Sequence, residues 1–263
     1  MTNRATRLLR QALMTGAIAL CGIATAAGQS ATQPIHQADA FGATPLHAAA
    51  AAGDLAAVTQ MVAANKASIN QTDNFGATPL HAAAAEGRID VVTFLLSNKA
   101  NVDARDIYGA TPLYRAVQND QELVIRHLLA RNANPNAATN DGLTPLHWAA
   151  LRGTLTNAQL LLEHGANVNA RSKVQQITPL HETWSGNRAD MAKLLASHGA
   201  DLNAVEKWYG FTPLHFAGFS MKMELAEALV AAGADPTIKA ADGFTVDIQQ
   251  MRKFREAVLQ GGK

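Results

Sequence analysis

The sequence predicts an all-α repeat solenoid, a stack of helix-turn-helix units, from three observations. The first is a tetrapeptide, Thr-Pro-Leu-His or once Thr-Pro-Leu-Tyr, whose copies begin at Thr44, Thr78, Thr111, Thr144, Thr178 and Thr212. The second is its spacing, because successive copies start 33 or 34 residues apart. The third is an apolar row at helical spacing later in each unit, such as Val91, Val92, Leu95 and Leu96. A unit this short cannot bury its apolar faces alone, so the units must stack.

Each copy of the tetrapeptide predicts the start of a first helix, called helix one. Thr is a favourable N-cap, and the Pro that follows suits position N1, where a backbone N–H would lack an intrahelical partner. The His then falls at N3, from which its ring can reach back to the cap as Glu does in a capping box. Small residues follow, as at 48–52 and 82–85, and they allow neighbouring helices to approach closely.

A polar turn separates helix one from a second helix, called helix two, which carries the apolar row. Three glycines are expected to end helix two in the left-handed conformation; they are Gly165, Gly199 and Gly233. The first three units have Lys66, Lys99 and Asn132 at this place. A lysine there should cost about 1 kcal/mol, because a Cβ disfavours the left-handed region.

The C-terminal stretch predicts a capping helix for the end of the stack. The last copy of the motif is degenerate, Thr245-Val246-Asp247. Beyond it, apolar residues lie among Gln, Arg, Lys and Glu. These apolar residues are Ile248, Met251, Phe254 and Val258. A polar outer face is what the terminal unit of a solenoid requires.

These features resemble the ankyrin-repeat family over residues 39–260, as six repeats and a degenerate capping repeat from Thr245. The resemblance includes a Gly two residues before Thr, at Gly42, Gly76, Gly109, Gly142 and Gly210. It implies that the segment before each Thr, called the finger, is a short β-hairpin. It also implies that a partner protein docks on the concave surface formed by the finger tips and the exposed positions of helix one.

The N-terminus predicts export. Residues 1–26 contain Arg4, Arg7 and Arg10, no acid, and an apolar run that ends in small residues, as a secretory signal peptide does. Cleavage is expected after Ala26 or Ala27, and residues 27–38 are expected to form a linker. The processed chain would have 19 Lys and Arg against 21 acids and no Cys, which suits an oxidising compartment. A bacterial periplasm is the expected location, with an extracellular one as the alternative.

The composition and motifs exclude several classes of function. A formal net charge of +1 gives no broad basic field for nucleic acid, and one Cys excludes a disulfide framework. One His per repeat spaces these rings by about 8 to 10 Å, the distance between packed helices, whereas zinc needs ligands about 2 Å from one centre. No phosphate-binding or hydrolase motif is present. We therefore expect no enzyme activity, cofactor or metal, no membrane association after signal cleavage, and a monomer.

Aromatic residues provide the candidate binding site. Phe41, Phe75 and Tyr108 occupy the same finger position as Tyr209. The sixth unit adds Trp208 and Phe211 in its finger and Phe219 late in helix one. These seven residues are expected to form an aromatic stripe that contacts a partner, since aromatics often anchor protein interfaces. The alternative is that the finger aromatics only pack against neighbouring fingers.

The fifth unit departs from the pattern and keeps other functions open. Gln176 replaces the finger Gly, Thr183 replaces an Ala, and Trp184 lies on helix one; the fifth and sixth fingers are also one residue longer. The leading hypothesis is a non-enzymatic scaffold or adaptor, such as an inhibitor or protective partner of an exported protein. The alternatives are a ligand-binding or catalytic site in the fifth and sixth units, and an envelope structural spacer.

Overall fold

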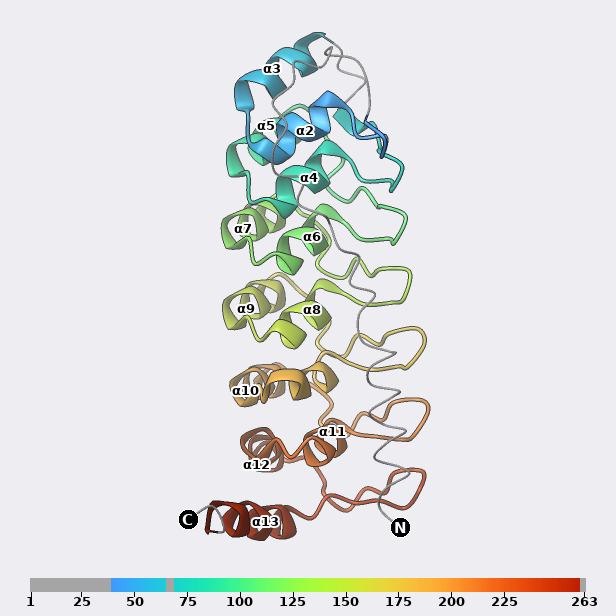
Figure 1. Cartoon of the computed structure of the whole chain (residues 1–263), viewed down its shortest axis with the longest axis vertical. Coiled ribbons are helices and arrows are strands. Elements are labelled where there is room, and N and C mark those ends of the chain that lie inside the picture. The colour runs from blue at the N-terminus through green and yellow to red at the C-terminus, as the bar shows by residue number, and fades with distance from the viewer. Residues whose placement is uncertain (1–38, 65–68, 261–263) are drawn as a thin grey trace. The chain divides into compact units, whose positions relative to one another are not determined.

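The computed structural model describes residues 39–64 and 69–260, which belong to one compact unit spanning residues 36–263. Within it the helices pair along the chain, helix one with helix two (Figure 1). The pairs are α2 (Pro45–Ala52) with α3 (Leu55–Ala64), α4 (Pro79–Ala85) with α5 (Ile89–Ser97), α6 (Pro112–Gln118) with α7 (Glu122–Ala130), α8 (Pro145–Arg152) with α9 (Leu155–Glu163), the 3₁₀ helix η2 (His181–Gly186) with α10 (Ala189–Ser197), and α11 (Pro213–Phe219) with α12 (Met223–Ala232). Helix α13 (Ile248–Gln260) follows the last pair. The predicted signal peptide, residues 1–26, the linker, residues 27–38, and Lys66 lie outside the described residues.

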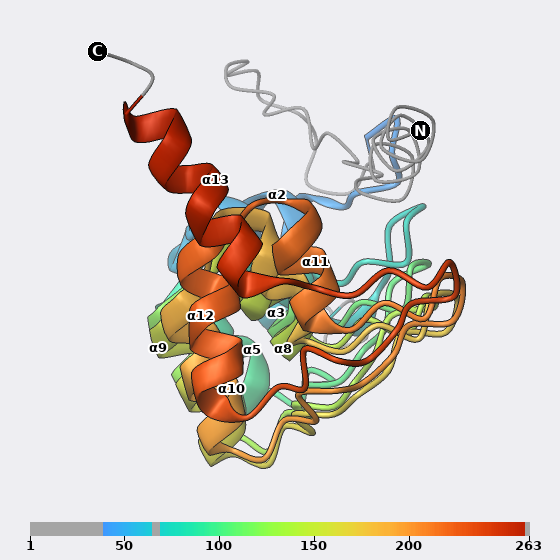
Figure 2. The ribbon, with the colours of Figure 1, turned by 90° about the horizontal axis from the view of Figure 1, so that it is seen from below.

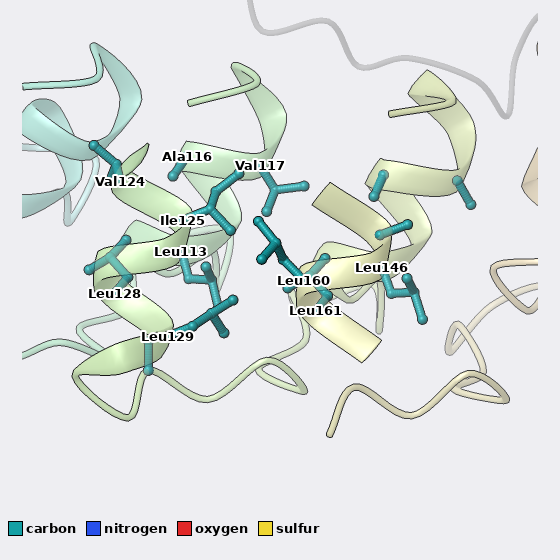
Figure 3. Packing of buried hydrophobic residues seen from close by; sticks show 14 of the residues in the cluster. Leu113, Ala116, Val117, Val124, Ile125, Leu128, Leu129, Leu146, Leu160 and Leu161 are labelled. Carbon is teal, nitrogen blue, oxygen red and sulfur yellow. The ribbon is translucent and has the colours of Figure 1, made fainter. Parts of the chain in front are cut away.

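Two layers of helices run along the stack, and this confirms the predicted all-α solenoid. Each helix one packs on the next helix one, as α4 does on α6, and each helix two packs on the next helix two, as α10 does on α12. The apolar rows meet between the layers, where Leu113, Ile125, Leu128, Leu146 and Leu161 are fully buried (Figure 3). Burying each such side chain contributes about 1.5–3 kcal/mol, and fully buried leucines also lie in the second, fifth and sixth units.

In the five units whose motif ends in His, the threonine and the histidine form the predicted cap. In the first unit the Thr44 backbone N–H donates to His47 Nδ1 at 3.1 Å, and Thr44 Oγ1 lies 2.8 Å from the same nitrogen. Thr78, Thr144, Thr178 and Thr212 make the same contacts with the histidines three residues later. Because Nδ1 accepts a backbone N–H, the proton of the neutral ring is assigned to Nε2.

The same histidines also join one unit to the next. His47 Nε2 lies 3.0 Å from the carbonyl oxygen of Ala77, the last residue of the following finger. The other four pairs, at 3.1 to 3.2 Å, are His81 with Ala110, His147 with Ile177, His181 with Phe211, and His215 with Phe244. Each ring therefore holds a helix start against the next finger.

The fingers are closed loops rather than pairs of strands; they comprise residues 39–43, 73–77, 106–110, 139–143, 172–177, 206–211 and 240–244. In the second finger the Asp73 N–H donates to Ala77 O at 2.9 Å, and the Gly76 N–H donates to Asp73 O at 3.0 Å. This hairpin-like pair of bonds is too short for a ladder, and no strand occurs in residues 39–64 and 69–260. The fingers project to one side of the helices (Figure 2).

A second set of bonds connects the fingers to one another. The Asn74 N–H donates to Phe41 O at 3.0 Å, and the Ile107 N–H donates to Phe75 O at 2.8 Å. The pattern continues at 2.7 to 2.9 Å from Asn140 to Tyr108, from Lys173 to Asp141, from Lys207 to Gln175 and from Ala241 to Tyr209. The acceptor is always the residue that precedes the finger Gly or its replacement. This ladder fixes the spacing of the finger tips.

Two helices end in a residue that replaces the expected Gly. Lys99 and Asn132 adopt the left-handed conformation, with φ of 70° and 61°, as expected of residues that replace the terminal Gly. The expected C-terminal helix is α13, which follows the degenerate motif. Asp247 caps α13, because its Oδ1 accepts the Gln250 N–H at 2.9 Å, and Thr245 lies before the helix.

The fifth unit is irregular in structure as well as in sequence. Its helix one is the 3₁₀ helix η2, and Gln176 takes the left-handed conformation that Gly has in other fingers, with φ of 58°. Thr183 is buried where other units have Ala, and its hydroxyl donates to Leu180 O at 2.7 Å. Such a hydrogen bond to a nearby carbonyl competes with regular helix bonding and accompanies the change of helix type.

Candidate functional site

One position of helix one faces the fingers. Arg115, on α6, donates to Asp106 of its own finger, and its guanidinium lies 5.9 Å from the centre of the Tyr108 ring. Phe216, at the same place on α11, lies 6.0 Å from the ring of Phe211 in the sixth finger. We call the residue that follows the motif His or Tyr the inner row; its members are Ala48, Ala82, Arg115, Trp148, Glu182 and Phe216.

Five of the seven predicted aromatics are exposed on the fingers. Phe41, Phe75, Tyr108, Trp208 and Tyr209 have between 40% and 62% of their surface exposed. Phe41 and Phe75 stack on each other with ring centres 6.2 Å apart. The stripe is interrupted between Tyr108 and Trp208, where Asp141 and Gln175 occupy the equivalent place. The structure therefore brings the predicted residues together as two separate groups on one ladder of fingers.

Phe211 requires a correction, because it does not reach the surface. It is only 3% exposed and lies 5.3 Å from the Tyr209 ring and 4.9 Å from the Phe219 ring. Phe219 is half-buried and lies 4.4 Å from Phe244 of the following finger. Phe211 thus packs against Tyr209, and Phe219 packs against Phe211. The residues of this finger that remain exposed to a partner are Trp208 and Tyr209.

The inner row contains residues that the aromatic count alone did not select. Trp148 donates through Nε1 to Gln118 O at 3.3 Å and tilts against Tyr114 at 6.3 Å. Phe216 meets His181 edge to face at 5.6 Å and lies 6.3 Å from Trp184. Their positions could have been found from register, because each directly follows the motif His.

The charged groups near this surface are mostly satisfied. Asp106 is buried but pairs with Arg115 and accepts the N–H groups of Tyr108 and Ala110, both at 2.9 Å. Glu206 is buried and accepts the N–H groups of Trp208 at 2.8 Å and Phe211 at 3.2 Å. Glu182 differs, because burial raises its pKa to about 7 and no compensating partner is present among the described residues.

The cap histidines are neutral at physiological pH. Burial lowers the pKa of all five, and lowers those of His147 and His181 to about 4. Their ring nitrogens are engaged by the cap and the next finger. Across residues 39–64 and 69–260, no three His, Cys, Asp or Glu side chains are arranged to hold a metal ion. In the same part of the chain no helix has both the length and the apolar character needed to cross a bilayer.

Comparisons with known proteins agree with this architecture. A family model described as ankyrin repeats (3 copies) matches residues 19–106, 100–172 and 168–240. Among solved structures, the ankyrin repeat domain of Bcl-3, a member of the IkappaB protein family, is 30% identical with a TM-score of 0.71, and the match covers 81% of this chain and 99% of that chain. The human ASB11 ankyrin repeat domain is 28% identical with a TM-score of 0.69, covering 81% and 97%. No curated protein matches the chain. The tandem family matches and the stacked helix pairs together place the chain in the ankyrin repeat family.

Proposed function

We propose that this protein is an exported, non-enzymatic scaffold that binds a partner protein on the surface formed by the fingers and the inner row. The observation that carries the proposal is the group of exposed aromatics, above all Trp208 and Tyr209, on fingers joined by backbone hydrogen bonds. A surface fixed in this way loses little conformational freedom on binding. An inhibitor or protective partner of an exported protein is one role of this kind.

Export is supported by the sequence of residues 1–26. The proposal predicts that the protein isolated from its source begins at residue 27 or 28 and is recovered with periplasmic or secreted proteins. Mass spectrometry of the intact protein, together with cell fractionation, tests this. An unprocessed chain recovered with cytoplasmic proteins would contradict it.

Affinity capture tests partner binding. The purified protein and a Trp208→Ala, Tyr209→Ala variant serve as baits for the envelope fraction of the source organism, and bound proteins are identified by mass spectrometry. The matched control is Leu123→Ala, which removes an apolar side chain that is 68% exposed on α7. A protein that binds the parent and the control but not the aromatic variant supports the proposal. Equal capture by all three baits contradicts the aromatic site, and capture by none favours a structural spacer or a ligand-binding protein.

A further inference from the structure

Glu182 is the exception in the inner row. It follows His181 in η2, and the equivalent residues of four other units are uncharged: Ala48, Ala82, Trp148 and Phe216. The remaining member, Arg115, is charged but fully engaged, since it bonds to Asp106 and to Gln118 Oε1 at 2.9 Å. Of the two charged members of the row, Arg115 has a partner within its own unit, and Glu182 has none among residues 39–64 and 69–260.

The Glu182 carboxylate has no partner in the part of the chain that the structure describes. It accepts no hydrogen bond and forms no ion pair with residues 39–64 or 69–260, although the residue is half-buried. Sheltered carboxylates elsewhere, those of Asp106 and Glu206, are bonded to a guanidinium or to backbone N–H groups. A partly desolvated carboxylate without such bonds is destabilising, so its charged form is favoured only when a cation approaches.

The surroundings of Glu182 are aromatic. Its helix η2 packs between α8, which carries Trp148, and α11, which carries Phe216. Both aromatic side chains are half-buried members of the same row, so part of each remains accessible beside the carboxylate. The cations on these neighbouring helices are engaged elsewhere or buried: Arg152 of α8 lies 4.0 Å from Asp120, and His147 and His215 serve as caps.

We propose that Glu182, flanked by Trp148 and Phe216, binds a single arginine or lysine side chain that the partner protein inserts between the helices and the fingers. A carboxylate supplies the opposite charge, and aromatic faces attract cations while excluding water from the pair. Burial raises the pKa of Glu182, and a bound cation would lower it. The inference rests on the proposed function, because it names the chemistry of the partner.

A titration with n-butylguanidinium chloride tests the cation site directly. Binding to the full protein is followed by NMR through the Trp148 indole N–H and the Glu182 side-chain carboxyl carbon. We expect saturable shifts at both, and an affinity at least about tenfold weaker in Glu182→Gln, which corresponds to the loss of one charge-assisted contact. The neutral isostere N-butylurea is expected to give no saturable shift. Gln is uncharged and nearly isosteric, so the variant retains the fold.

Glu86→Gln is the matched control, because it removes an exposed carboxylate from the end of helix one in another unit. It is expected to bind n-butylguanidinium as the parent does. Equal affinity in the parent and Glu182→Gln, or no saturable shift in the parent, would overturn the cation site.

The two proposals fail separately. If n-butylguanidinium does not bind but a captured partner is still lost with Trp208→Ala, Tyr209→Ala, the cation site is wrong and the scaffold function stands. If n-butylguanidinium binds at Glu182 but no protein is captured by any bait, the cation site stands and the scaffold function is wrong. With a captured partner in hand, the combined proposal also predicts weaker capture by Glu182→Gln than by Glu86→Gln.

Discussion

His181 Nε2 lies 3.2 Å from the carbonyl oxygen of Phe211, so the ring that caps the fifth unit also holds the sixth finger. That finger presents Trp208 and Tyr209, and the buried Phe211 ring stacks beneath Tyr209. A residue of the repeat framework thus positions the residues proposed to meet the partner. The same two-sided use of histidine recurs in four other units, and it makes stability depend on pH.

The cap histidines should destabilise the protein in acid. The pKa values of His147 and His181 fall from 6.5 to about 4 on folding, so the stability they contribute is present above pH 6.5 and lost as the pH falls towards 4. Each should account for about 3 kcal/mol at most. Urea unfolding of His147→Gln between pH 7 and pH 4 should show a smaller loss than the parent. The exposed His198→Gln is the control, and an unchanged pH slope in His147→Gln would contradict the assignment.

The effect of Glu182 on stability should have the opposite pH dependence to that of the cap histidines. Its pKa rises from 4.5 to about 7 on folding, so its contribution to stability is greatest below pH 4.5 and declines as the pH rises towards 7. Glu182→Gln should therefore stabilise the protein at pH 8 by about 2 kcal/mol, allowing for partial exposure, and leave it unchanged at pH 4. Urea unfolding at the two pH values checks this. A gain of equal size at both would show that charge is not the cause.

A ladder of Asn and Asp side chains in the loops after helix two connects each unit to the next, and Asn136 and Asn169 make a second bond in it that Asp103 lacks. Asn136 Oδ1 accepts the Asn167 N–H at 2.7 Å, and its Nδ2 donates to Gly165 O at 2.9 Å. Asp103 accepts the Asn134 N–H at 3.0 Å in the same way. A carboxylate cannot donate a hydrogen bond, so Asp103 does not make the bond that Asn136 makes to a carbonyl at the end of the next helix two. Asp103→Asn should add that bond and stabilise the protein by about 1 kcal/mol. Thermal unfolding should rank Asp103→Asn above the parent and Asp103→Ala below it, and the reverse order would refute the ladder.

Lys99 occupies a backbone conformation that suits Gly. Its φ of 70° is close to the 82° of Gly199 at the end of α10, where a Cβ would meet no atom within 4 Å. Lys99→Gly should stabilise the protein by about 1 kcal/mol, and Gly199→Lys should destabilise it by a similar amount. Denaturant midpoints of the two variants check the pair. Changes of the same sign would contradict an explanation based on φ alone.

Alanine variants of Phe211 and Trp208 should distinguish a residue needed for stability from a residue needed for binding. Phe211→Ala removes a buried ring and should cost about 3–5 kcal/mol. Trp208→Ala removes a ring that is 50% exposed and should change the free energy of unfolding by less than about 1 kcal/mol while abolishing partner capture. Unfolding and capture measured on both variants test this. A strongly destabilised Trp208→Ala would mean that this ring packs rather than binds.

The starts and ends of most helices could be predicted from the sequence. Thr, Pro and His within four residues define a helix start through contacts that span three residues, and Gly or its replacement marks a helix end through one φ angle. These interactions are short in range, so the same residues at the same spacing form the same cap in five units. The register of the finger aromatics followed from the same repeat.

The sequence by itself therefore determined the repeated unit, its caps and the need to stack, while the tertiary structure decided what each unit presents to its neighbours. Only stacking places His181 against Phe211 and sets Glu182 between the helices that carry Trp148 and Phe216, with no partner for its carboxylate in residues 39–64 and 69–260. The physical reason is distance along the chain. These contacts join residues about thirty positions apart, and their geometry depends on how closely packed helices approach, which no local preference specifies.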